Sequence, residues 1–249
     1  MVLSRSAVQE LYKTGIDRYS SFIAAFQSRQ GIQALLRSSH LLRNGLRVLD
    51  AGCGFGMATF ALIEALRHKN LDHKSIDGFD LTPAMLARFQ ETLEARGITR
   101  VQLRRADVLT LAALPSSWTN YDLILSTSML EYLPKQDLPR ALKGLRARLS
   151  PNGHMLVMIT RKTLETRILI EWWWHAERYT KDELLRALGG RVPRLCIPAI
   201  SVALFLAEPW VLRCRGPIMS VNRSVGGGNL GVLPLPFSIY SGSVPSCSQ

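Results

Sequence analysis

Cysteine is scarce in this sequence. Only four of the 249 residues are cysteine, at positions 53, 196, 214 and 247. No two of them have the spacing of a zinc site or of a dithiol redox motif. We therefore expect reduced thiols, a cytoplasmic location and no bound metal.

Long apolar runs and targeting signals are also missing. The longest apolar run of the second half, Ile197 to Ala207, is too short to cross a bilayer and is followed by Glu208. The first residues have no basic segment followed by an apolar core, so we expect no secretory signal. No internal repeat is apparent. These absences favour a single globular core without a membrane span.

Acidic residues are outnumbered by basic ones, 19 to 31, which gives a formal net charge of +12. Such an excess raises the possibility of RNA or an anionic membrane surface as a partner. The basic residues are spread through predicted helices, however, and no added RNA-binding module is recognisable. We therefore favour a small molecule as the partner and keep nucleic acid and anionic lipid as alternatives.

What the sequence does contain is a glycine loop between a strand and a helix. The apolar run that begins at Arg47 ends on Asp50 and is followed by glycines at every second position, to Gly56. Glycine lets the chain turn sharply and brings backbone N–H groups against a ligand before the next helix, predicted over 57–67. The dinucleotide pattern G-x-G-x-x-G fails here, because Met57 or Thr59 stands where its last glycine belongs.

A second strand ends on an acid. Gly78-Phe79-Asp80 is followed by Thr82 and Pro83, which are typical of the N-cap and first position of a helix. An acid placed after a glycine loop in this way can accept hydrogen bonds from both hydroxyls of a ribose. The alternative is an acid that only interacts with the helix dipole.

Further strands alternate with amphipathic helices. Short strands are predicted over 101–103 and 121–126, and a helix from Asp137 ends at the turn 150–153 before a strand over 154–159. This alternation predicts a largely parallel sheet covered on both faces, with the ligand at the carboxyl ends of the strands.

Taken in order, these segments resemble the motifs of class I S-adenosylmethionine-dependent methyltransferases, beginning with Val48-Leu49-Asp50-x-Gly52-Cys53-Gly54-x-Gly56. The resemblance implies a Rossmann-like α/β fold, with a mostly parallel seven-stranded sheet flanked by helices. It implies one domain over 46–216, an N-terminal helical cap over 1–45 and a lid insertion at about 161–178. The remaining residues, 217–249, are rich in Gly, Ser and Pro and read as a flexible tail.

The resemblance also implies S-adenosylmethionine as the cofactor and assigns contacts to it. Asp80 would bind the ribose and Asp107 the adenine amino group, although an Asp in a polar loop is also commonly solvated. Tyr19 of the cap could cover the methionine part, or only pack. The implied cofactor-binding residues are Asp50, Gly52, Cys53, Gly54, Gly56, Asp80, Leu81, Asp107, Val108, Ser126 and Tyr19.

The acceptor side is less defined. In related enzymes the segment after the fourth strand, here 127–134, faces both cofactor and acceptor, and many members have histidines where Glu131 and Tyr132 stand. Glu131 and His175 are the candidate bases for an acceptor that must lose a proton. His175 follows Trp172-Trp173-Trp174, which cannot all face one side of a helix, so at least one is available to an acceptor, a partner or a membrane.

These patterns predict an enzyme that transfers a methyl group from S-adenosylmethionine to a small apolar or aromatic acceptor, at oxygen, nitrogen or carbon, by in-line displacement. Two alternatives stay open. One is an RNA or lipid methyltransferase, and the other is a non-catalytic cofactor-binding or interaction protein of the same fold.

Thr180 and Glu183 form a capping-box pattern, which predicts the start of a helix after the lid.

Overall fold

The computed structural model describes residues 28–160 without a gap. Outside this range it describes residues 10, 177, 179, 180, 182, 183 and 186, and the backbone of 195–196, 200–201, 209–215 and 238–239. Most of the predicted cap, lid and tail therefore lies outside the described residues. In the tail, the described part is the short strand β9, Ser238–Ile239, which pairs with β7, Ile200–Ser201.

A sheet of seven strands in the order β3-β2-β1-β4-β5-β8-β6 forms the centre of the protein. The first five of these run parallel to one another. The strand β8 is antiparallel to β5, and β6 is antiparallel to β8. Their bounds are Leu46–Ala51 (β1), His73–Asp80 (β2), Val101–Arg105 (β3), Tyr121–Thr127 (β4), Leu149–Thr160 (β5), Leu195–Cys196 (β6) and Pro209–Arg215 (β8).

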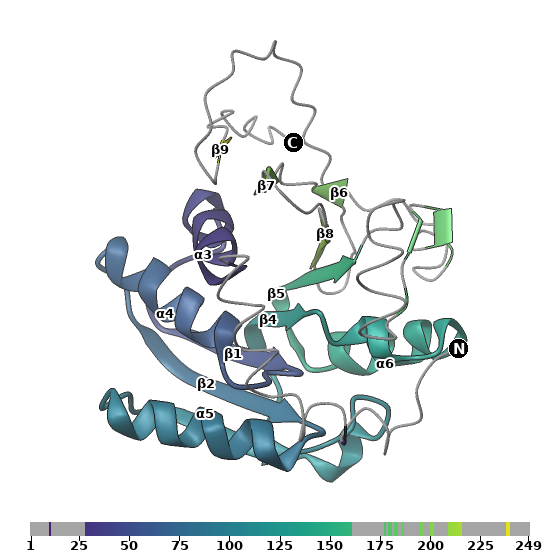
Figure 1. Cartoon of the computed structure of the whole chain (residues 1–249), viewed down its shortest axis with the longest axis horizontal. Helices are drawn as coiled ribbons and strands as arrows, with labels where there is room; N and C mark the ends of the chain where they lie inside the picture. The colour runs from purple at the N-terminus through teal and green to yellow at the C-terminus, as the bar shows by residue number, and fades with distance from the viewer. Residues whose placement is uncertain are drawn as a thin grey trace.

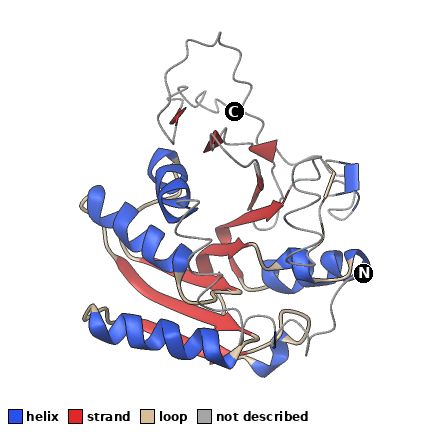
Figure 2. Cartoon of the chain, in the orientation of Figure 1, coloured by secondary structure: helices blue, strands red, loops and turns tan. Residues whose placement is uncertain are grey.

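Helices lie on both sides of this sheet, as Figures 1 and 2 show. Short 3₁₀ turns follow β3 and β4. The bounds are Ser28–Ser38 (α3), Met57–His68 (α4), Pro83–Ala95 (α5), Leu138–Arg146 (α6), Leu111–Ala113 (η1), Leu130–Tyr132 (η2) and Lys135–Asp137 (η3). None of the described helices has both the length and the apolar character that crossing a membrane requires. The predicted Rossmann-like architecture is confirmed.

The core consists of two large apolar clusters, one on each face of the sheet. Because side chains alternate along a strand, Val48 of β1 packs with Leu36 and Leu62 from α3 and α4. Its neighbour Leu49 faces the opposite cluster, which contains Leu142 of α6. Burial on both faces explains why the parallel strands are almost continuously apolar.

One boundary differs from the sequence prediction. The helix α6 ends at Arg146, and β5 begins already at Leu149 instead of at His154. The pairing of β5 with β4 shifts here, because Tyr121 pairs with Leu149 while Leu123 pairs with His154. Only a glycine fits in this irregularity, since a Cβ on Gly153 would lie 2.4 Å from the carbonyl oxygen of Tyr121.

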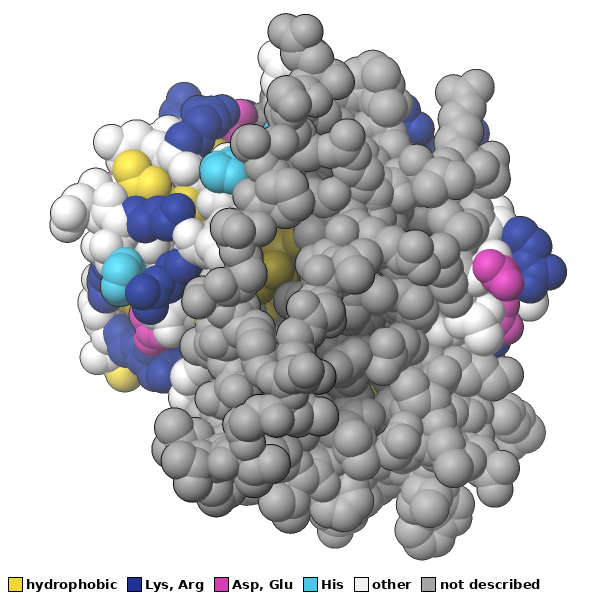
Figure 3. Space-filling view, turned by 90° about the horizontal axis from the view of Figure 1, so that it is seen from above, with side chains coloured by type: hydrophobic (Ala, Val, Ile, Leu, Met, Phe, Trp, Pro, Cys, Tyr) yellow, Lys and Arg dark blue, Asp and Glu magenta, His cyan; other side chains and the backbone are white. Residues whose placement is uncertain are grey.

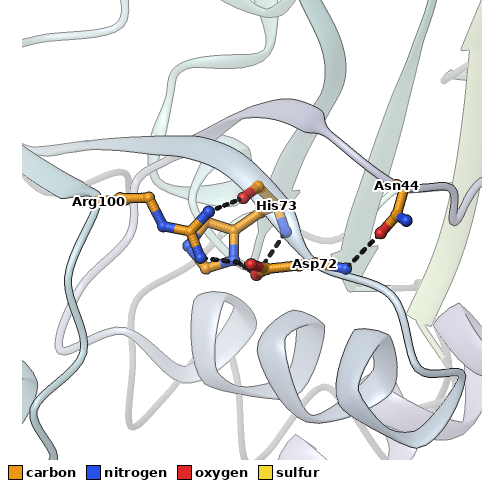
Figure 4. A network of polar contacts seen from close by, with 4 residues as sticks. All are labelled: Asn44, Asp72, His73 and Arg100. Carbon is orange, nitrogen blue, oxygen red and sulfur yellow. Dashed lines mark hydrogen bonds and ion pairs between the residues drawn. The ribbon is translucent and has the colours of Figure 1, made fainter.

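A polar network joins the amino ends of three strands (Figure 4). Arg100, which precedes β3, donates to the carbonyl oxygen of His73 at 2.6 Å and to Asp72 Oδ2 at 2.5 Å. The backbone N–H of Asp72 donates to Asn44 Oδ1, in the turn before β1, at 2.8 Å. Burial lowers the pKa of His73. The network thus connects the starts of β1, β2 and β3. The predicted site lies at the other ends of these strands.

Candidate cofactor site

A cleft lies at the carboxyl ends of the parallel strands, where the sequence predicts the ligand. Its walls come from the glycine loop after β1, the end of β2, the loop after β3 and the segment after β4. The lining residues are Gly52, Gly54, Phe79, Asp80, Leu81, Thr82, Met85, Ala106, Asp107, Val108, Thr127, Ser128, Met129, Tyr132 and Leu133.

The glycine loop packs too closely for other residues at two positions. Gly52 has a φ of +71°, and a Cβ there would lie 2.2 Å from Cγ of Met129. Gly56 has a φ of +94° directly before α4, and a Cβ there would lie 2.2 Å from Cε2 of Phe89. Positive φ values strain residues that carry a side chain. The loop therefore holds its shape only as glycine at these points.

Asp80 connects the end of β2 to the glycine loop. Its Oδ2 accepts a hydrogen bond from the backbone N–H of Gly54 at 2.9 Å, and its Oδ1 accepts one from Thr82 N–H at 2.8 Å. Burial raises the pKa of Asp80, and these N–H groups oppose that rise. The carboxylate is thus oriented by backbone donors while it faces the cleft.

Asp50 lies fully buried behind the glycine loop. Its Oδ2 accepts a hydrogen bond from Thr59 Oγ1 at 2.6 Å, and burial raises its pKa to about 6. Its Oδ1 has no hydrogen-bond partner among the described residues, and neither has Oγ of Ser126 on the neighbouring strand β4. Buried polar atoms are seldom left without a partner, so each of these oxygens can still accept a hydrogen bond, for which a buried water is the ordinary donor.

The loop after β3 forms the opposite wall. Asp107 is half-buried, and its Oδ1 accepts a hydrogen bond from the backbone N–H of Leu109 at 2.8 Å. Apolar side chains surround this part of the cleft, contributed by Phe79, Met85 and Val108. Such a lining suits a flat, mostly apolar ring with a few polar edges.

The end of β4 and the segment after it form the remaining wall, and the side chains that line the cleft there are uncharged. Its contribution to the lining is Thr127, Ser128, Met129, Tyr132 and Leu133. The candidate base Glu131 is buried and does not line the cleft, and its carbonyl oxygen accepts a hydrogen bond from Glu177 N–H at 2.7 Å. Its predicted catalytic role gains no geometric support.

Six of the residues predicted to bind the cofactor line this one cleft: Gly52, Gly54, Asp80, Leu81, Asp107 and Val108. Four others, Asp50, Cys53, Gly56 and Ser126, belong to the loop and strand ends around it without appearing in its lining. Tyr19 and His175 lie outside the described residues. In the part of the chain that the structure describes, no group of acids, histidines and cysteines could hold a metal ion.

Sequence reasoning missed several contributors, among them Thr59 and Met129. Thr59 donates the hydrogen bond that orients Asp50, and Met129 fills the space left by the missing Cβ of Gly52. Thr59 is an ordinary helix residue, nine positions after the acid, and no local pattern indicates its role. Met129 lies in the segment predicted to face the cofactor, but its packing depends on a contact with a distant loop.

Comparisons with known proteins agree with this geometry. Residues 48–153 match the family model described as a methyltransferase domain. The carboxy-S-adenosyl-L-methionine synthase of Chromohalobacter salexigens is 32% identical over 150 residues, which cover 60% of this chain and 51% of that protein. The malonyl-[acyl-carrier protein] O-methyltransferase of Halorhodospira halophila is 29% identical over 154 residues, or 62% of this chain and 48% of that protein.

Residues 48–153 are thus similar to the methyltransferase domain, which supports the resemblance to class I S-adenosylmethionine-dependent methyltransferases. A solved structure of similar fold is magnesium protoporphyrin IX methyltransferase from Synechocystis with bound S-adenosylhomocysteine. The TM-score is 0.63 at 17% identity, over 84% of this chain and 98% of that one. The chain spans about half the length of these two curated relatives.

The cofactor of the family is S-adenosylmethionine, as the sequence predicts. The residues of the cleft fit that molecule on two counts. An oriented carboxylate at Asp80 suits a ribose, and the apolar wall suits an adenine.

Proposed function

We propose that the protein is an enzyme that transfers the methyl group of S-adenosylmethionine to a small apolar or aromatic acceptor. The observation that carries this proposal is the contact between Asp80 and the glycine loop. This hydrogen bond, from Gly54 N–H to Asp80 Oδ2 at 2.9 Å, brings the two predicted cofactor motifs together in one cleft. The cleft then continues to an uncharged wall after β4, where an acceptor would meet the methyl group.

The protein's own task in such a reaction is to bind and orient. When bound, S-adenosylmethionine supplies a methyl group that its sulfonium has already activated. Asp80 would accept hydrogen bonds from the ribose hydroxyls, and Asp107 one from the adenine amino group. Met129 and Leu133 would help to exclude water near the transferred methyl. The walls of the cleft would hold the acceptor atom in line with that methyl group.

The uncharged wall bears on the kind of acceptor. Thr127, Ser128 and Tyr132 offer hydroxyl groups there, while no Lys, Arg, His or Glu is among the described lining residues. Such a surface favours an apolar or aromatic molecule that is held by packing and a few hydrogen bonds. Since Glu131 is turned into the protein interior, we propose that the acceptor brings a lone pair that needs no base from this wall.

A polyanionic acceptor has less support. The cleft has no described cation in its lining, although the chain carries a net charge of +12. Lys and Arg side chains instead gather at the left of Figure 3, over the side on which α3 and α4 lie. Exposed cations of these helices and their ends include Arg37, Arg67 and Lys69. Among the described residues, this outer surface is where an RNA or lipid substrate would find cations.

Calorimetric titration with S-adenosylmethionine, S-adenosylhomocysteine and NADH tests the first half of the proposal. We expect micromolar binding of the first two and none of NADH. Mass spectrometry of a panel of aromatic, lipid and RNA acceptors after incubation with S-adenosylmethionine tests the second half. Binding without methyl transfer to any of them would instead favour a non-catalytic cofactor-binding protein, and a folded protein that binds neither compound would contradict the proposal.

A further inference from the structure

A cluster of ionised side chains lies behind the wall that follows β4. Its centre is Lys135, the first residue of η3, whose Nζ is 2.7 Å from Glu183 Oε1 and 3.6 Å from Glu177 Oε2. The same Nζ lies over the ring of Tyr179, 5.3 Å from its centre. One lysine therefore contacts three residues that are more than forty positions away in the sequence.

The distant segment is fixed to the wall by its backbone and its core side chain as well. Glu177 N–H donates to the carbonyl oxygen of Glu131 at 2.7 Å. The side chain of Tyr179 is 1% exposed and belongs to the same apolar cluster as Leu130 and Leu133. Contacts of three kinds thus connect Glu177, Tyr179 and Glu183 to residues near Tyr132 of the cleft wall.

The segment has its own rigid element. Glu183 Oε2 accepts a hydrogen bond from Thr180 N–H at 2.7 Å, and Thr180 Oγ1 accepts one from Glu183 N–H at 3.2 Å, which is the predicted capping box. Burial raises the pKa of Glu183, but the bonds from Lys135 and Thr180 outweigh it and lower that pKa to about 2. The carboxylate therefore stays ionised at any working pH and holds both partners.

Charge balance makes Lys135 the critical member. Glu183 Oε1 and Glu177 Oε2 both approach its Nζ, and after burial itself the carboxylates of Glu177, Glu131 and Glu183 raise the pKa of the buried Tyr179. Lys135 is the one cation that the described residues place among them. Without it, Glu177 and Glu183 would lose the described cation that joins them to η3.

We propose that Lys135 is a positioning residue that couples occupancy of the cofactor cleft to the docking of residues 177–183. Lys135 is two residues from Leu133, which lines the cleft, so an ordered wall and a docked segment favour each other. By linkage, a ligand that orders the wall also tightens the docking, and loss of docking weakens the ligand. This inference rests on the proposed function, because the ligand is the cofactor.

The test is calorimetric titration of S-adenosylhomocysteine into the full chain and into Lys135→Met, which keeps the stem and removes the charge. We expect the affinity to fall about five- to tenfold, at the low end of the usual range of coupling between sites. Hydrogen exchange should show that the ligand protects the amides of 177–183 in the wild type and not in the variant. Lys74→Met, at an exposed lysine of β2 that pairs with no described acid, is the matched control and should bind as the wild type does.

Lys135→Arg separates positioning from a general loss of structure, because it keeps the cation beside Glu177 and Glu183 and leaves the capping box intact. Retention by Lys135→Arg of at least half of the binding free energy that Lys135→Met loses supports the inference. Unchanged affinity in Lys135→Met, or an equal loss in Lys135→Arg, overturns it. A wild type that binds no S-adenosylhomocysteine contradicts the proposed function itself, which is a distinct outcome.

Discussion

The carboxylate of Asp80 accepts a hydrogen bond from the backbone N–H of Gly54, so the end of β2 and the loop after β1 form one unit. The two residues are 26 positions apart and come from adjacent parallel strands. This contact orients the acid before any ligand arrives, which reduces the cost of ordering it on binding.

Replacing Asp80 by Ala removes the proposed ribose acceptor. We expect the affinity for S-adenosylhomocysteine to fall at least about tenfold, since hydrogen bonds to a charged group are worth about 1.5–3 kcal/mol. Calorimetry measures the affinity, and circular dichroism checks that the fold is retained. Glu91→Ala on the exposed side of α5 is the control. Equal affinities of wild type and Asp80→Ala would remove the ribose assignment.

Glycine substitutions should separate backbone strain from steric overlap. Gly56→Ala combines a φ of +94° with a Cβ that would be 2.2 Å from Phe89, whereas Gly97→Ala combines a φ of +60° with open space. The strain alone costs about 1–2 kcal/mol, and we expect Gly56→Ala to lose clearly more than that. Urea denaturation gives both free energies of unfolding. Similar losses in the two variants would show that the packing on Phe89 is not limiting.

Asp50 should make stability depend on pH. Its pKa is raised by burial from 3.8 to about 6, so the folded state holds a proton more tightly than the unfolded state does. The stability contributed by protonated Asp50 is complete below about pH 4 and is lost as the pH rises through 6, by up to about 3 kcal/mol. Asp50→Asn lacks this loss, so its free energy of unfolding relative to the wild type should increase between pH 4 and 7. Parallel pH profiles of the two proteins would contradict the assignment.

The buried pair of Tyr121 and Asp77 offers a test of the core. The hydroxyl of Tyr121 donates to Asp77 Oδ2 at 2.8 Å, and both side chains are buried. Tyr121→Phe leaves a buried carboxyl without its donor, so we expect a loss of about 1–3 kcal/mol in chemical denaturation. Asp77→Asn in the same chain should recover part of it, and strictly additive losses would show that the pair does not interact.

The elements around the first motif could be predicted closely from the sequence. The helix expected over 57–67 is α4, Met57–His68, and the N-cap expected at Thr82 is found there. These signals are local, because the glycines, the cap residue and the apolar spacing all lie within one turn or strand. The start of β5 was wrong by five residues, since it depends on the close approach of Gly153 to Tyr121, which no local pattern encodes.

The same distinction applies to the site. Asp80 was predicted as a cleft residue because it ends a strand after a glycine loop, and Asp107 because its segment resembles the family motif. The ion pairs of Lys135 were not, because their partners are brought together only by the fold. Glu131 shows the converse, since its place in the motif suggested chemistry while its side chain is buried away from the cleft.

The separation of charge in this protein has a kinetic consequence. The cleft is lined by two aspartates and by no described cation, while the whole chain carries +12. S-adenosylmethionine has a net positive charge and S-adenosylhomocysteine has none, so the protein's long-range field repels only the substrate form before it reaches the cleft. Added salt screens that field over about 10 Å and should speed the entry of S-adenosylmethionine while leaving S-adenosylhomocysteine almost unaffected. Ionic strength would then set how strongly the product competes with the substrate for the empty cleft.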